Sequence, residues 1–484
     1  MEAEATTDIM DNGIGCPELF GRKEITTSVD EITRDNLMDV LDKAMAVHTV
    51  NAAQIDYLDR YMRGEQPILG RKKTIRPDIC NRIVENHAAE ITQFTSGYFL
   101  GEPVTYVRRG ERDAAGEQVA QLNSYMFNED KASHDKDLAT WMAICGVGYR
   151  MVLPGRYPDD EDYSPFELDT PDPRTTFVVY HSGFGHRRMM GVRVIYKESK
   201  GGSFEMWCCG YTRTHYFEVK DHVLLKWERH LFDDIPIYEY RLNMSRMGSF
   251  EAALPLLNAI NNIMSNRVDG VEQFVQSFLK FVNCEMDSND VPNIGKLGAI
   301  FIKAPEGMQC DVSLVSQELN QEQTQTLVDY LYDQVLVICG MPTTKKGGTS
   351  TSDTGQAVFL RDGWSQAEAR ARDTELLFKR SEKEFLRQVL KIIREDKKAG
   401  FDLRLNEVEC KFTRRQHDNL QSKTQALNGM LQAGIAPEVA IASCGLFNDP
   451  LDVTRQSEKY LVKWAPIPLQ FSDDNPVNDE DEEA

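Results

Sequence analysis

The sequence lacks long hydrophobic runs, a basic or apolar leader and an excess of positive charge. Its most apolar stretch, Val335–Met341, is far shorter than the ~20 residues that cross a bilayer, so we predict a soluble protein with no membrane partner and no secretion signal. Lys and Arg total 55 against 76 Asp and Glu, which gives a net charge of −21. Such a chain is poorly suited to coat nucleic acid statically.

Paired cysteine motifs are also missing. The ten cysteines lie between Cys16 and Cys444 without CxxC spacing, and the adjacent Cys208 and Cys209 alternate across an expected strand. We predict reduced, mostly buried thiols of a cytosolic protein and no zinc site.

Enzyme signatures are absent too. Gly295-Lys296 is followed by Leu297, and Lys346–Thr349 has the reverse order of a phosphate-binding GxxxxGK[ST] loop. Neither HExxH nor GxSxG occurs. The acidic residues of Asp159–Asp162 could imitate a metal site, but a solvated loop is the simpler interpretation. We therefore predict no catalytic residue, no cofactor and no bound metal.

What the sequence contains is an α+β pattern long enough for about three structural units. Between Tyr149 and Asn243, runs with alternating apolar residues predict a β-rich domain. These runs are Thr175–Tyr180, Gly191–Tyr196, Phe204–Tyr211 and His215–Val219. Before this domain, Asp78 could cap a helix that continues to Phe99.

Two amphipathic segments predict a helical hairpin with a decorated tip. Apolar residues recur at steps of three and four from Pro255 to Val282, and a second helix is expected over Asn320–Cys339. Between them we expect a small insertion whose strands are Gly298–Lys303 and Asp311–Val315. A projecting stalk is the predicted shape.

The C-terminal third is predicted to be mainly helical. The polar segment Thr343–Asp353 predicts a mobile, locally positive loop, followed by a long helix, Thr354–Lys398, kinked at Gly363. A strand, Leu403–Phe412, then precedes two helices, Gln416–Ala433 and Pro437–Cys444. Seven acidic residues among the last twelve predict a disordered tail.

Several strings, taken in their order, resemble the portal proteins of long-tailed bacteriophages. YMRGEQPI at Tyr61–Ile68 is similar to the family's YxxGxxPI, and GYFLGEPV at Gly97–Val104 to its "yLGkPv" string. CGVGY at Cys145–Tyr149 and IPIYEY at Ile235–Tyr240 match later landmarks. Asp353–Ala357 departs from the pattern, because the family usually has Ser-Gly where this chain has Thr-Gly, with an aliphatic residue next.

The resemblance spans Leu41–Leu461 and implies a ring-forming portal fold with a β-rich wing, a two-helix stem, a small α/β clip, a long kinked helix and an α-helical crown. The implied parts are an N-terminal arm (1–40), the wing (41–253 with 355–415), stem helix 1 (254–282), the clip (283–318), stem helix 2 (319–340), a tunnel loop (341–353), the long helix and wing strand (354–415), the crown (416–464) and an acidic disordered tail (465–484).

The same resemblance implies a dodecameric ring at the capsid vertex of the virion, assembled in the host cytoplasm, through which double-stranded DNA is packaged and ejected. The implied partners are the terminase large subunit, head completion or adaptor proteins, and the major capsid protein with its scaffold. The tunnel-loop residues expected to contact DNA are Thr343, Thr344, Lys345, Lys346 and Thr349. The candidates for the stem lumen are Gln325, Asp329 and Asp333.

Elementary physics supports this interpretation. Stalk helices with apolar stripes need neighbours to bury them, and a head-to-tail contact that closes by rotation forms a ring. An acidic bore repels phosphates, so that only short basic contacts hold DNA. Two alternatives stay open: a metal-dependent nucleic-acid enzyme that uses Asp159–Asp162, and a structural adaptor that binds proteins only and lacks a DNA-sized axial hole.

Overall fold

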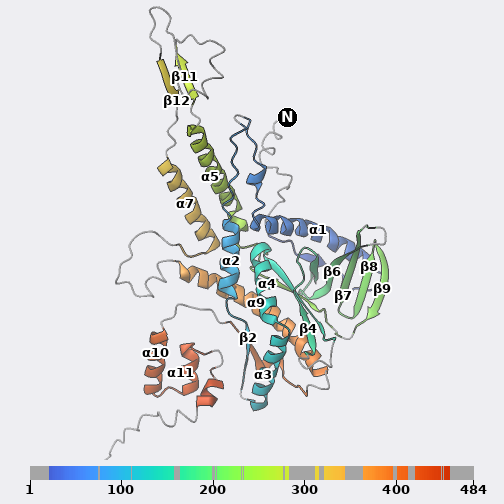
Figure 1. The fold of residues 1–484 in the computed structure, drawn as a ribbon. Helices are drawn as coiled ribbons and strands as arrows, with labels where there is room; N and C mark the ends of the chain where they lie inside the picture. The colour runs from blue at the N-terminus through green and yellow to red at the C-terminus, as the bar shows by residue number, and fades with distance from the viewer. Residues whose placement is uncertain are drawn as a thin grey trace, which may run out of the picture. The chain divides into compact units, whose positions relative to one another are not determined.

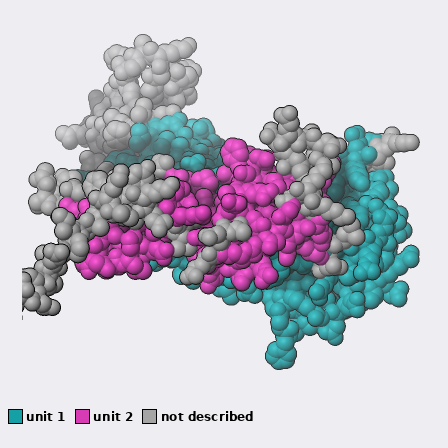
Figure 2. All heavy atoms as spheres, turned by 90° about the horizontal axis from the view of Figure 1, so that it is seen from below, with its two compact units in different colours: residues 1–99, 133–153, 168–388 teal, residues 100–132, 154–167, 389–484 magenta. Residues whose placement is uncertain are grey.

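The structure is a computed structural model, shown as a ribbon in Figure 1. It describes residues 21–74, 77–110, 112–156, 164–198, 202, 204–230, 232, 234–275, 278–282, 311–315, 321–343, 363–395, 400–412, 420–447, 450 and 452–457. The chain divides into two compact units, coloured in Figure 2. The first comprises residues 1–99, 133–153 and 168–388, and the second residues 100–132, 154–167 and 389–484. The mixed helix and strand content confirms the predicted α+β class.

A six-stranded sheet dominates the β-rich region. Its order is β1 (Ile25–Thr27), β5 (Thr176–His181), β6 (Arg188–Glu198), β7 (Phe204–Thr212), β8 (His215–Lys220) and β9 (Val223–Arg229). The four predicted runs coincide with β5 to β8, whereas β1 and β9 were not predicted. β1 pairs in parallel with β5, and the later pairs are antiparallel.

One face of this sheet is covered by helix α1 (Leu37–Met62). Leu37, Val40 and Leu41 from the helix share a buried cluster with Phe177 and Val192 from the sheet. The alternation of apolar residues along each strand therefore has a direct cause, because every second side chain faces α1.

Strand β3 (Val147–Pro154) lies between β10 (Ile237–Arg241) and β4 (Phe166–Asp169) and directly follows helix α4 (Lys131–Cys145). Gly146 makes this turn with φ +83°, and a Cβ there would lie 2.3 Å from the carbonyl carbon of Arg246. A Cβ on Gly148 would lie 2.7 Å from a methyl carbon of Leu138. Both glycines of the CGVGY string are thus required by close approach of neighbouring chain.

The predicted hairpin is present, with a different first helix. After a 3₁₀ turn η2 (Glu251–Ala253), helix α5 spans Leu254–Val275, and α7 (Gln321–Cys339) returns beside it. The continuous helix predicted up to Val282 is wrong, because Phe278–Val282 forms strand β11 and pairs antiparallel with β12 (Asp311–Val315). The pattern FLKFV alternates and so suits a strand once a partner is available. The predicted partner, Gly298–Lys303, lies outside the described residues.

Another predicted helix begins later than expected, because α2 spans His87–Phe99 instead of starting at Asp78. Of the predicted helix Thr354–Lys398, the structure describes helix α9, which spans Trp364–Glu395, and Gly363, which immediately precedes it with φ +79°. Residues 354–362 lie outside the described residues.

The second unit contains a two-stranded sheet, β2 (Thr105–Arg108) with β13 (Val408–Lys411), and helix α3 (Asp113–Asn128). Of the predicted strand Leu403–Phe412, only β13 is a strand, because Leu405–Glu407 forms a 3₁₀ turn, η4. Arg112 bonds the carboxylates of Asp402 and Glu407 at 2.5 and 3.1 Å. Helices α10 (Leu420–Gln432) and α11 (Pro437–Cys444) follow at the predicted places.

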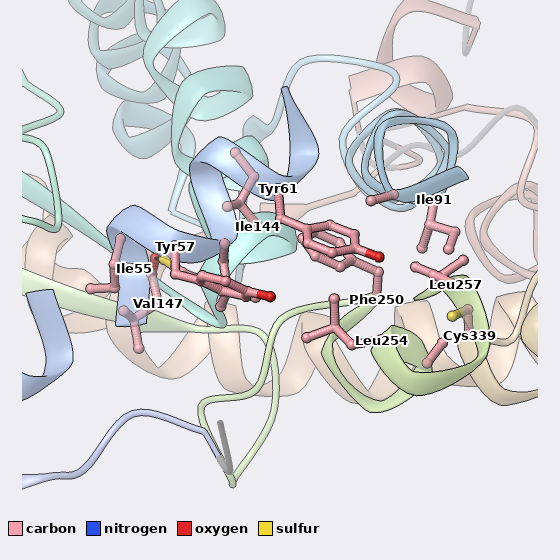
Figure 3. Close-up of a cluster of buried hydrophobic side chains, with 14 of the residues drawn as sticks. Ile55, Tyr57, Tyr61, Ile91, Ile144, Val147, Phe250, Leu254, Leu257 and Cys339 are labelled. Atoms are coloured by element: carbon pink, nitrogen blue, oxygen red, sulfur yellow. Dashed lines mark hydrogen bonds between the residues drawn. The ribbon is translucent and has the colours of Figure 1, made fainter. Parts of the chain in front are cut away.

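The largest buried cluster of the first unit anchors the base of the hairpin (Figure 3). Leu254 and Leu257 of α5 and Cys339 of α7 pack with Tyr61 and Phe250. The rings of Tyr61 and Phe250 stack with centroids 6.0 Å apart, and the Tyr61 hydroxyl donates to Asn258 Oδ1 at 2.9 Å. The hairpin is therefore continuous with the core and not an appendage on a flexible linker.

The described cysteines are mostly buried, as the sequence predicts. The seven described cysteines are free thiols, and five of them are buried. Burial raises the pKa of the Cys145 thiol to about 12. No helix in the described ranges is long and apolar enough to span a membrane.

Candidate functional site: the helical stalk

The stalk, which we define as α5 and α7, has three layers when the chain beside it is included. Residues 71–74 and 77–86, here called the strap, lie along α5 on the side away from α7 (Figure 1). On the other side, Arg267 of α5 donates to Gln321 and Gln325 of α7 at 2.6 and 2.5 Å. The strap, α5 and α7 therefore follow one another as neighbours.

Side chains of α5 hold the strap by its backbone. The amides of Asn81, Ile83 and Glu85 donate to the side chains of α5 at 2.7, 2.9 and 2.8 Å. Their acceptors, in the same order, are Asp269, Ser265 and Asn261, each spaced by four residues and buried. Alternate amides of an extended chain match successive turns of a helix, which explains why this segment is not the start of α2.

Asp269 is the centre of this contact. Its carboxylate accepts from Lys73 Nζ at 2.7 Å, from Arg71 Nη1 at 2.9 Å and from two nitrogens of Asn81. Burial alone raises the pKa of Asp269, but the hydrogen bonds from Lys73 and Asn81 and the charge of Arg71 outweigh it and lower the pKa below its ordinary value. The positive charges of Arg71 and Lys73 are therefore neutralised within the chain by the carboxylate of Asp269.

The exposed surface of α7 carries two stripes. An acidic stripe contains the three predicted lumen residues together with Glu322, and all four are exposed. Gln325 bonds Arg267 and donates to Asp329 Oδ1 at 2.6 Å, while Asp333 follows one turn later. The structure therefore brings the three predicted residues together on one face, as their spacing required.

Four apolar residues, here called the apolar stripe, are exposed on α7. Val337 is two residues, or about 200°, from the fully buried Val335. This stripe consists of Leu327, Tyr330, Val337 and Ile338, which are 47, 59, 46 and 39% exposed. Val268 and Val271 of α5 are exposed as well. Such a concentration of exposed apolar side chains indicates a contact surface.

Only residues 341–343 of the predicted tunnel loop (341–353) are described. Thr343 is described, whereas Thr344, Lys345, Lys346 and Thr349 lie outside the described residues. The missing Cβ of Gly363 would lie 3.7 Å from Pro342 Cα and from Thr343 N, so the two described ends of this segment are adjacent. Gly340, with φ +69°, packs against the guanidinium-bearing side chain of Arg370, where a Cβ would be 2.4 Å from Nε.

Sequence reasoning missed a hollow of about 600 Å³ beside these ends. Its walls come from α2, the loop after β10, the end of α7 and the first half of α9. Apolar side chains from all four segments line it, including Phe94, Tyr98, Met244, Met247, Ile338 and Leu376. These residues lie in four distant parts of the sequence, so no local pattern could have revealed it.

A buried ionic network holds the first half of α9 against the strands. Arg150 of β3 is fully buried and pairs with Asp135 of α4 and, at 3.1 Å, with Glu382 of α9. Tyr240 of β10 donates to Glu382 at 2.6 Å. Burial and the neighbouring Glu382 carboxylate raise the pKa of Tyr240 well above its ordinary value, so the phenol stays a donor.

The described residues show no metal-binding geometry. The described residues contain no group of three His, Cys, Asp or Glu side chains that could hold a metal ion. Asp159–Asp162, the basis of the enzyme alternative, lies outside the described residues.

The architecture defines a class of protein: an α+β chain in which an antiparallel helix hairpin carries a strand pair at its tip and continues at its base into a β-rich core. A family described as "Phage portal protein, SPP1 Gp6-like" matches residues 41–459 of the 484. This chain belongs to that phage portal protein family, which confirms the resemblance drawn from the sequence strings.

Two solved structures of GTA particles contain chains with some similarity to this one. A chain from "Neck of empty GTA particle computed with C6 symmetry" is 13% identical with a TM-score of 0.43, covering 78% of this chain and 90% of that one. A chain from "Virion of native gene transfer agent (GTA) particle" is 11% identical with a TM-score of 0.42, covering 85% and 93%. No curated protein matches this chain.

Proposed function

We propose that this chain assembles into the portal ring at the capsid vertex of a phage virion. The ring is a channel through which double-stranded DNA is packaged and ejected, and it docks the terminase large subunit during packaging and head completion or adaptor proteins afterwards. The family match supports a portal protein. We further propose that the ring is a dodecamer, that double-stranded DNA passes through it, and that these proteins are its partners.

The apolar stripe of α7 carries this proposal. Leu327 and Tyr330 are about half exposed on a helix that already has another face buried, so the chain alone leaves this surface in water. At about 25 cal/mol per Å² of apolar area, burial against a neighbour is favourable. A surface that meets a different surface of the next copy generates a closed ring when the rotation closes.

The parts of the proposed ring keep the sequence assignment, with one helix corrected. We assign the wing to residues 41–253 with 355–415, the clip to 283–318, stem helix 2 to 319–340, the tunnel loop to 341–353 and the crown to 416–464. Stem helix 1 is α5, which ends at Val275 instead of residue 282. The major capsid protein and scaffold surround the ring in this proposal.

The mass of the purified chain tests assembly. A ring of twelve 55.1 kDa chains has a mass of about 660 kDa, which light scattering or analytical ultracentrifugation distinguishes from a monomer. We expect the ring species to dominate at micromolar concentration. A chain that stays at 55.1 kDa at every concentration, under virion-like salt and pH, contradicts the proposal.

The lysines of the proposed tunnel loop provide a second test. The variant Lys345→Ala/Lys346→Ala is expected to form rings normally but to lower packaged or retained DNA severalfold, because it removes two cations that can contact phosphates. The measurement is DNA per filled head, with Lys391→Ala on α9 as a control for loss of charge. Unchanged DNA content in the double variant removes both lysines from the mechanism.

A further inference from the structure

We propose that, in the ring, the strap of one copy packs against the exposed surface of α7 of the next copy. Lys72 and Arg82 of the strap pair with the acidic stripe of α7, chiefly Glu322, Asp329 and Asp333. This inference rests on the proposed ring and adds which two surfaces meet in it. In this proposal the acidic stripe of α7 lies at the boundary between copies and not in the bore, which is where the sequence predicts Gln325, Asp329 and Asp333.

The two surfaces lie on opposite sides of one chain. On α5, Ser265 holds the strap and Arg267 contacts α7, and these positions are about 200° apart around the helix. The strap is therefore one flank of the stalk, and the exposed surface of α7 is the other. A contact between opposite flanks of successive copies is head-to-tail, which is the geometry that closes a ring.

The strap has cations to spare. Arg71 and Lys73 are neutralised by Asp269. Lys72 and Arg82 are exposed, and neither forms an ion pair with any residue that the structure describes. Two positive charges with no internal partner thus line the outer side of a segment held rigidly to α5 by backbone hydrogen bonds.

The acidic stripe has the complementary excess. Glu322, Asp329 and Asp333 are exposed, and none forms a salt bridge within the described ranges. The nearest described cation on the stalk, Arg267, bonds the amide oxygens of Gln321 and Gln325 instead. Asp329 and Asp333 are one turn apart and Glu322 lies two turns before Asp329, so these like charges repel one another unless a cation from outside the chain lies between them.

The apolar stripe explains why the partner is a second copy and not DNA. Tyr330 is three residues before Asp333 and so lies beside the acidic stripe, and a partner that covers both must bury apolar area and supply positive charge together. A phosphate backbone does neither, whereas a protein surface with Lys72 and Arg82 supplies the charge. The apolar contact contributes most of the affinity, and the charges fix partner and direction.

Charge reversal tests this pairing. We compare Lys72→Glu/Arg82→Glu with Asp329→Lys/Asp333→Lys and with a control, Arg34→Glu/Lys43→Glu, which reverses two exposed cations outside the stalk, one just before α1 and one on it. Each stalk variant alone is expected to lose at least tenfold of its ring fraction in sedimentation, while the control assembles like the wild type. All substituted side chains are exposed, and circular dichroism verifies that each variant folds.

Mixing provides the decisive arm. In an equimolar mixture of the two stalk variants, each reversed strap meets a reversed α7, and each native strap meets a native α7, so alternating rings are expected to recover to at least half of the wild-type fraction. Full assembly of either variant alone, or failure of the mixture to recover, overturns the pairing.

The remaining outcomes separate this inference from the ring itself. If single variants assemble fully but pass DNA differently, the acidic stripe lies in the bore, and the pairing is wrong while the ring stands. A wild-type chain that never assembles contradicts the proposed function and not only the pairing.

Discussion

Replacement of Arg150 by Met is expected to lower the free energy of unfolding of the first unit by about 3–5 kcal/mol. Arg150 is fully buried between the carboxylates of Asp135 and Glu382, and its guanidinium carbon lies 5.1 Å from the ring centres of both Tyr240 and Phe385. Methionine fills much of the same volume but carries no charge. The variant removes the guanidinium that the two buried carboxylates share, which accounts for most of the expected loss.

Two controls identify the cause. Arg156→Met removes an exposed pair with Glu167, in which the arginine side chain is 68% exposed, and is expected to cost less than about 1 kcal/mol. The triple variant Arg150→Met/Asp135→Leu/Glu382→Leu also removes the two carboxylates and is expected to regain most of the lost stability. Urea unfolding measures all three. A loss of less than about 1 kcal/mol for Arg150→Met at pH 7 contradicts the role given to this network.

Replacement of Asp269 by Ala is expected to release the strap from α5. The change removes the acceptor for the Asn81 amide and the partner of Arg71 and Lys73, so we expect exchange of the Asn81 amide to accelerate by about 100-fold and local stability to fall by about 3 kcal/mol. Hydrogen exchange measured by mass spectrometry or NMR reads this directly. Asp269→Asn keeps an acceptor but no charge, so its Asn81 amide is expected to exchange at a rate between those of the wild type and Asp269→Ala.

The sign of the pH effect at Asp269 follows from its lowered pKa. The carboxylate contributes stability that is fully present above its ordinary pKa of 3.8 and is lost as the pH falls through the lower folded value. Strap protection is therefore constant at neutral pH and declines only in acid. Asp329→Ala, on the exposed side of α7, is the matched control, and it leaves the strap amides protected. Unchanged exchange in Asp269→Ala contradicts the strap contact.

The strap also shows where sequence reasoning reached its limit. The spacing of Ile79 and Ile83 suits a helix. No local sequence feature shows that backbone amides of this segment donate hydrogen bonds to side chains almost 200 residues later. The signal lay in α5, where Asn261, Ser265 and Asp269 form a polar line four residues apart along one face of the helix. A polar residue on every turn of a buried helix face predicts that another segment forms hydrogen bonds with it. The pattern does not identify that segment.

The ends of the hairpin were mispredicted for a similar reason. FLKFV fits both a helical and an alternating pattern, and only the pairing of Phe278 with Val315 decides between them. By contrast, β5 to β8, α7 and α11 were predicted near their observed bounds, because each carries a full local signal in period, cap or breaker. The Arg150 network had no sequence signal, since Arg150 is a single charge within a strand.

The central claim is that many copies of this chain surround an open axis. Electron microscopy of the assembled particle, with class averages viewed down the symmetry axis, tests it most directly. We expect a closed ring with a central hole wide enough for duplex DNA. Particles that are solid at the centre, open chains of subunits, or single compact molecules would contradict it.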